Sequence, residues 1–168
     1  MKKLFAILLS ACLALTVFVG CSNSSSVKLQ PFSVSYSDFK TNFISLAESM
    51  DKTTSEISTE QSYNGKKLLH IIVSTPGVED TTVSCLVDEN TDELYNINLC
   101  GYLTPYFNSY ANITLESASI TVSPTDLKYK LAIPEAKSSY NTTVDLDGYT
   151  FVYSQNQDSQ SFSIRPQK

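Results

Sequence analysis

Histidine, tryptophan, glycine and charged residues are all scarce in this sequence of 168 residues. It has one His, no Trp and five Gly, and charged residues make up 17% of it. A lone histidine leaves a zinc site short of the three or four convergent ligands it needs, and five glycines leave no glycine-rich loop of the kind that holds nucleotide phosphates. The net charge of -5 argues against nucleic acid, because such binding needs clustered Lys and Arg. We expect no cofactor, no metal and no nucleic-acid partner.

Apolar residues are present in the proportion typical of a folded protein. They make up 42% of the chain, which excludes a disordered or low-complexity protein. A chain of this length forms one domain by default. Because charge is low, Ser, Thr, Asn and Gln must supply most of the polar surface.

The N-terminus has the pattern of an export signal. Lys2 and Lys3 precede residues 4–19, which carry no charge. This run is shorter than the roughly 20 apolar residues that span a bilayer, and it suits the apolar region of a secretory signal. A conventional signal-peptidase site after Gly20 fits poorly, because Phe18 stands where a small residue is required.

Residues 17–21, Val-Phe-Val-Gly-Cys, are followed by Ser-Asn-Ser-Ser-Ser and resemble a bacterial lipoprotein signal. The resemblance covers about the first 25 residues, with Phe18 where that family usually has Leu. It implies that Cys21 receives a diacylglycerol and becomes the first mature residue. A similar motif ending at Cys12 leaves too few apolar residues before it. An uncleaved membrane anchor and conventional secretion are the alternatives.

This interpretation divides the chain into three parts. Residues 1–20 are the signal peptide, residues 21–33 are the lipidated cysteine with a flexible Ser-rich tether, and residues 34–168 form a single domain. Two acyl chains give stable anchoring where one does not. We therefore expect a protein held at the extracytoplasmic face of the cell membrane by its lipid.

The mature chain begins with a helix and continues as strands. Ser37 is a candidate cap for a helix that begins at Asp38, and Phe39, Phe43, Leu46 and Met50 form its apolar stripe. An alternation of polar and apolar residues then predicts four strands, over residues 53–63, 66–75, 81–87 and 94–99. The first two strands are joined by a hairpin turn at Asn-Gly 64–65. The glycine at residue 101 is expected to break the pattern.

The second half repeats the order of helices followed by strands. Thr-Pro at 104–105 and Ser-Pro at 123–124 are typical helix starts. Three further strands are predicted over residues 142–146, 149–153 and 161–165, the first two joined by Asp-Gly at 147–148. The expected fold is α+β, with antiparallel meanders and helices packed on one face. Two small tandem αβ units are the alternative.

Four groups of residues are candidates for a special role. Cys85 and Cys100 lie in or beside neighbouring strands, so they form either a disulfide or two buried thiols. Tyr102, Tyr106 and Tyr110 recur at a spacing of four and form either an exposed binding patch or part of the core. The acidic residues 88–93 fit only part of a calcium loop and otherwise form a hairpin turn. His70 has no catalytic partner in the sequence, so we interpret it as structural.

The sequence therefore favours a non-catalytic binding module at the bacterial cell envelope. Its partner would be an envelope protein or a wall component. The alternatives are a small hydrolase that uses dispersed carboxylates and an accessory protein that binds a small ligand, for which the body is small.

Overall fold

The computed structural model describes residues 29–63, 65–102, 107–133 and 139–168. The expected signal peptide and the candidate lipid site Cys21 lie outside this part of the chain. Within it, no helix has the length and apolar character needed to cross a membrane.

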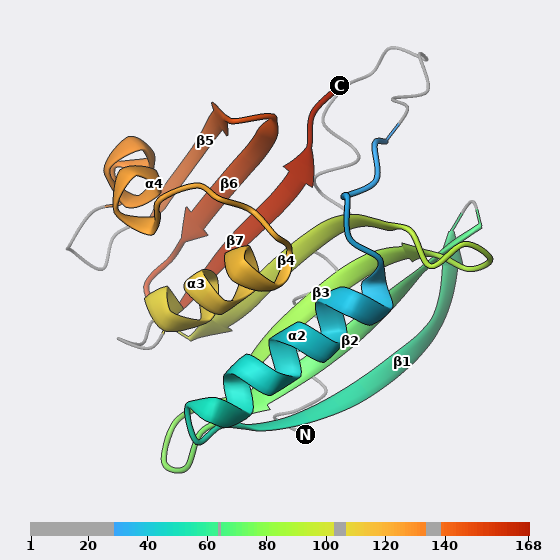
Figure 1. The fold of residues 1–168 in the computed structure, drawn as a ribbon. Helices are drawn as coiled ribbons and strands as arrows, with labels where there is room; N and C mark the ends of the chain where they lie inside the picture. The colour runs from blue at the N-terminus through green and yellow to red at the C-terminus, as the bar shows by residue number, and fades with distance from the viewer. Residues whose placement is uncertain (1–28, 64, 103–106, 134–138) are drawn as a thin grey trace.

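The described residues form three helices and seven strands (Figure 1). The helices are α2 (Tyr36–Ser49), α3 (Phe107–Ser117) and α4 (Pro124–Leu131). The strands are β1 (Thr53–Tyr63), β2 (Lys66–Ser74), β3 (Thr81–Asp88), β4 (Leu94–Tyr102), β5 (Tyr140–Leu146), β6 (Tyr149–Gln155) and β7 (Ser159–Pro166).

All seven strands belong to one antiparallel sheet with the order β1-β2-β3-β4-β7-β6-β5. Each half of the chain contributes a meander, and the last strands of the two halves, β4 and β7, pair at the centre. The α+β class is confirmed in its coarse form, because antiparallel strands and helices share one core, although the sheet makes up most of the structure. The two halves share a sheet rather than forming two.

Helix α2 begins earlier than the sequence predicted. Its cap is Ser35, whose Oγ accepts a hydrogen bond from the backbone N–H of Asp38 at 3.1 Å, so Ser37 lies inside the helix. The buried stripe is accordingly Tyr36, Phe39, Phe43 and Ala47. Met50, expected on the stripe, lies beyond the last helical residue and is exposed.

Strand β4 is longer than predicted because Gly101 continues it. A Cβ at this position would lie 2.9 Å from Thr81 Oγ1 on the neighbouring strand, so the glycine permits close approach rather than ending the strand. The Asp147–Gly148 turn agrees with the sequence: both residues have positive φ, 50° and 80°, as a two-residue hairpin of type I′ requires.

The core lies between the helices and one face of the sheet. Figure 1 shows the helices in front of the sheet, with α2 over the first meander and α3 and α4 over the second half. Phe39 and Phe43 of α2 belong to the same buried cluster as Ile97 of β4 and Ile164 of β7, which oppose each other across the central strand pair. No described helix lies on the other face of the sheet, which we call the back face.

Candidate functional site

The described tyrosines of the candidate patch, Tyr102 and Tyr110, do not share an exposed surface. Tyr110 in α3 is only 2% exposed, and its hydroxyl lies 2.6 Å from Thr75 Oγ1. Tyr102, at the end of β4, is 45% exposed, and Tyr106 lies outside the described residues. A helix buries one side of its surface, and the spacing of four placed Tyr110 on that side. Tyr110 thus belongs to the core, which is one of the two interpretations that the sequence allowed.

Of the two alternatives for Cys85 and Cys100, the structure has the pair of buried thiols rather than the disulfide. Both cysteines are free and buried. Cys85 opposes Ile97, whereas Cys100 opposes Thr82, so their positions differ by three residues along the strands. Side chains alternate between the faces of a strand, and an odd offset places the two thiols on opposite faces of the sheet. Burial raises the pKa of both thiols, which therefore remain protonated and unreactive.

Two rows of side chains cross the whole back face, and we call them the inner and outer rows. The pairing register places one residue from each strand in each row. In the order β1 to β5, the inner row is Ile57, His70, Ser84, Asn98, Ser163, Val152 and Thr143. The outer row is Ser55, Ile72, Thr82, Cys100, Ser161, Ser154 and Asn141. Neither row contains Asp, Glu, Lys, Arg, Phe or Tyr.

The centre of the inner row is a buried polar group of three residues. His70 Nδ1 lies 2.8 Å from Ser84 Oγ, and both side chains are fully buried. Asn98, on the next strand, is 5% exposed. Burial lowers the pKa of His70, which keeps the imidazole neutral at neutral pH. His70 Nε2 and Asn98 Nδ2 have no hydrogen-bond partner, which is unusual because buried polar atoms are nearly always paired.

This group does not have the arrangement of a hydrolase. A serine that bonds to a histidine is the first part of a nucleophilic site, but the second ring nitrogen then needs an orienting carboxylate. Here that nitrogen, His70 Nε2, has no hydrogen-bond partner and is buried.

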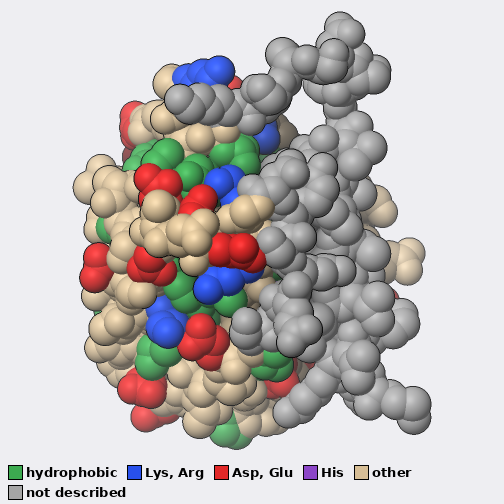
Figure 2. All heavy atoms as spheres, turned by 90° about the vertical axis from the view of Figure 1, so that its right-hand side faces the viewer, with side chains coloured by type: hydrophobic (Ala, Val, Ile, Leu, Met, Phe, Trp, Pro, Cys, Tyr) green, Lys and Arg blue, Asp and Glu red, His purple; other side chains and the backbone are tan. Residues whose placement is uncertain are grey.

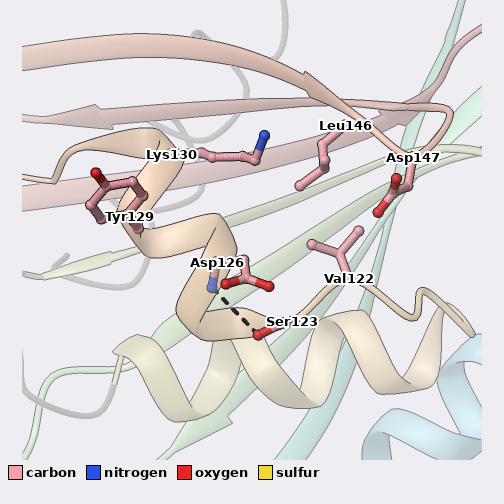
Figure 3. A pocket seen from close by; sticks show the side chains of 7 residues that line it. All are labelled: Val122, Ser123, Asp126, Tyr129, Lys130, Leu146 and Asp147. Atoms are coloured by element: carbon pink, nitrogen blue, oxygen red, sulfur yellow. Dashed lines mark hydrogen bonds between the residues drawn. The ribbon is translucent and has the colours of Figure 1, made fainter.

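A pocket lies between the start of α4 and the β5–β6 turn, with a volume of about 150 Å³ (Figure 3). Asp126, Lys130 and Asp147 reach it from these two elements, and Tyr129 at its rim is 86% exposed. Small-molecule sites usually have about 300–1,000 Å³ and a mostly apolar lining. This pocket is smaller and carries three charged groups, so it does not suit the small-ligand alternative.

The acidic segment at residues 88–93 forms the turn between β3 and β4. The Asp88 carboxylate accepts hydrogen bonds from the backbone N–H groups of Asn90 and Thr91, which lower the pKa of Asp88. The same carboxylate lies 3.5 Å from Lys66 Nζ. These contacts are those of a hairpin turn, and no three metal-ligating side chains gather among the described residues.

Charged side chains are common elsewhere on the surface. Figure 2, a view from the side, shows acidic and basic groups interspersed with apolar ones over the described residues. One such pair joins Lys40 of α2 to Glu56 of β1 at 3.0 Å. The two rows of the back face contain no such charged pair, and their central residues His70, Ser84 and Asn98 are buried.

Sequence reasoning singled out His70 but missed Ser84 and Asn98. The available signal was the alternation of uncharged polar residues with apolar ones along β3 and β4, at Thr82, Ser84, Asn96 and Asn98. That pattern places the polar residues on one face, but only the register shows that they meet His70.

Compared with known proteins, this chain matches no protein family, no curated protein and no solved structure.

Proposed function

We propose that this protein is a bacterial lipoprotein, anchored through Cys21 to the extracytoplasmic face of the cell membrane, whose back face binds another envelope protein without catalysis. The observation that carries the binding role is the pair of uncharged rows across all seven strands. Six strand spacings of about 4.8 Å give these rows a width of about 29 Å.

The composition of the rows favours a protein partner over a wall glycan. The cores of protein interfaces are depleted in charged residues and mix apolar with hydrogen-bonding groups. The inner row does this, with Ile57 and Val152 beside the polar centre of His70, Ser84 and Asn98. The rings of Phe and Tyr, which supply stacking surfaces for sugars, are absent from both rows.

The place where the segment before α2 reaches the sheet supports anchoring from one end of the sheet. Phe32 N–H donates to the Leu94 carbonyl at 2.7 Å, so the described end of the tether lies at the start of β4. The eight residues from Cys21 to residue 29 reach at most about 28 Å when extended. This end of the sheet also carries the acidic turn at residues 88–93, which anionic head groups repel. The lipid would therefore hold this end of the sheet close to the membrane.

The anchor is tested by membrane fractionation of the full chain in a bacterial host. We expect Cys21→Ser to abolish membrane retention, and its mass spectrum to lack the diacylglyceryl group, because the lipid is attached to the thiol of this residue. Cys12→Ser is the matched control and should remain membrane-bound. Retention of the Cys21→Ser chain, or an unmodified Cys21 in the native product, would contradict the proposal.

The binding surface is tested by affinity capture of the tagged full chain from envelopes solubilised in mild detergent. Asn98→Asp keeps the side-chain shape and adds a charge at the centre of the inner row, so we expect it to lose the partner that the native chain retains. Asn112→Asp makes the same change at an exposed position of α3 and should retain it. Circular dichroism checks that both variants fold. Equal capture by the two variants would exclude the back face.

A further inference from the structure

We propose that strand β5 binds an extended segment of a partner protein as an added strand at the edge of the sheet, with one Lys or Arg side chain of that segment in the pocket beside α4. This surface is the outer edge of the sheet rather than its back face, and it does not depend on the lipid anchor. Strand addition of this kind gives affinity through backbone hydrogen bonds and specificity through pockets for alternate side chains.

Strand β5 is the edge strand of the second half of the sheet, and its sequence does not protect that edge (Figure 1). Proteins commonly block an edge with Lys, Pro, a bulge or a covering element. All 7 residues of β5 pair with β6 without a register shift, and none of them is Lys or Pro. The opposite edge strand, β1, has a register shift between Ser58 and Ser62, which hinders the addition of a further strand.

The outer side of β5 presents backbone groups that are available for pairing. The turn at residues 147–148 has two residues, so Leu146 and Tyr149 on either side of it exchange both backbone hydrogen bonds. The alternate residues of β5 then direct the backbone N–H and C=O groups outward, and these residues are Asn141, Thr143 and Asp145. All three are exposed, and no hydrogen bond from the described part of the chain reaches their outward groups.

Apolar side chains on the front side of this edge are incompletely covered. Tyr140, Val144 and Leu146 pack against the core, yet each is only half-buried. The Tyr140 hydroxyl donates to the Leu131 carbonyl at the end of α4 at 2.8 Å, so this side of β5 faces the helix. An added strand would place its own alternate side chains beside these three and would complete their burial.

The pocket between α4 and the end of β5 has a volume of about 150 Å³, which is room for one side chain rather than for a separate ligand. In Figure 3 the carboxylates of Asp126 and Asp147 and the amino group of Lys130 point into the space between the two elements. None of these groups forms an ion pair within the described residues. Two carboxylates and one ammonium group leave one negative charge unmatched, so the pocket suits a Lys or Arg side chain.

The alternation of side chains sets the register of the added strand. Antiparallel pairing is the more stable arrangement, and it places directly opposite residues on the same side of the sheet. A residue opposite Leu146, which lines the pocket, therefore points toward the pocket. The residues opposite Val144 and Thr142 come second and fourth after it in the bound segment. We expect that segment to have a basic residue followed by apolar residues at those two positions.

Panning of a phage-displayed library of random peptides against the full chain in mild detergent tests this surface. We expect the enriched peptides to share Lys or Arg followed by apolar residues at the second and fourth later positions. An enriched peptide, synthesised with a fluorescent label, then gives a dissociation constant for each variant by anisotropy. The absence of an enriched peptide, or enrichment of peptides without this spacing, would overturn the proposal.

The backbone edge is tested by a proline on β5. Thr143→Pro removes an outward N–H, a change that an edge strand tolerates, and should weaken binding of the enriched peptide by about tenfold. Thr143→Ala keeps the N–H and should bind the peptide as the native chain does. Asn141→Pro makes the same change at the next outward residue and replaces Thr143→Pro if circular dichroism shows that the latter is unfolded. Unchanged affinity in a folded proline variant would exclude the edge.

The pocket is tested by removing one of its charges. Asp147 has a positive φ, which Asn also accepts, so Asp147→Asn removes the charge and keeps the turn. We expect this variant to bind the basic peptide about tenfold more weakly. Asp158→Asn, in the exposed β6–β7 turn, is the matched control and should leave the affinity unchanged. Equal affinities in the two variants would show that the pocket does not hold the basic side chain.

Discussion

The polar centre of the back face contains both paired and unpaired hydrogen-bonding atoms. The backbone places His70, Ser84 and Asn98 on adjacent strands in one row, where His70 Nδ1 lies within hydrogen-bond distance of Ser84 Oγ, whereas His70 Nε2 and Asn98 Nδ2 have no hydrogen-bond partner. A buried polar atom without a partner costs about 1–3 kcal/mol. Retaining two of them in one row is therefore unfavourable for the fold.

The protonation of His70 should make the fold sensitive to acid. Its pKa is lowered by burial in the folded state, so the unfolded chain binds a proton more readily. The stabilising contribution is complete above the unfolded pKa of about 6.5 and is lost as pH falls below it. We expect the thermal midpoint to drop between pH 7.5 and pH 5, and to drop less in His70→Gln, measured by circular dichroism. An identical pH dependence in both chains would show that His70 does not titrate on unfolding.

Helix α2 is positioned by a local capping residue and by side-chain contacts with strand β1. Ser35 caps its first turn, and residue 35 also forms an isolated bridge with Glu93. Farther along the helix, the Tyr36 hydroxyl donates to Glu56 on β1 at 3.0 Å, and Lys40 pairs with the same carboxylate. The cap therefore fixes where the helix starts, and these contacts fix it over the edge of the sheet.

Loss of the cap should weaken the fold by a modest amount. Ser35→Ala removes the acceptor for the Asp38 N–H, and we expect the free energy of unfolding to fall by about 1 kcal/mol in urea. Ser35→Asp keeps an acceptor and should cost little. Ser37→Ala is the control that separates the two possible caps. A larger loss at residue 37 than at residue 35 would restore the helix start predicted from the sequence.

The whole molecule is held together by the pairing of β4 with β7. Leu99 opposes Phe162 and Ile97 opposes Ile164, and all four side chains are in the buried core. These contacts join strands that belong to different halves of the chain. The sheet is therefore continuous, and neither half buries its apolar face without the other.

The two halves should unfold as one cooperative unit. Leu99→Ala leaves a cavity at the junction, and we expect a loss of about 2–5 kcal/mol in the free energy of unfolding. Hydrogen exchange should show reduced protection in both halves, including β2 and β6, by the same amount. Lower protection in only one half would show that the halves are independent units. Thr143→Ala, on the exposed edge strand, is the control and should change little.

The sequence by itself determined most of the elements, because their signals are local. Alternation, Asn-Gly and Asp-Gly turns and the Ser-Pro cap predicted the strands and α4 within a few residues. It also placed the candidate lipid site at Cys21, which depends on a contiguous motif. Where the signal was ambiguous, as with the two serines before α2, the prediction missed the helix start by two residues.

Only the tertiary structure decided which residues lie opposite one another on neighbouring strands of the sheet. The register between strands set Cys85 and Cys100 on opposite faces and aligned His70, Ser84 and Asn98 in one row. A shift of one residue would have reversed both results, because side chains alternate between faces with a period of two. Strand pairing over long separations, such as β4 with β7, is fixed by the packing of the whole core, and no local pattern records it.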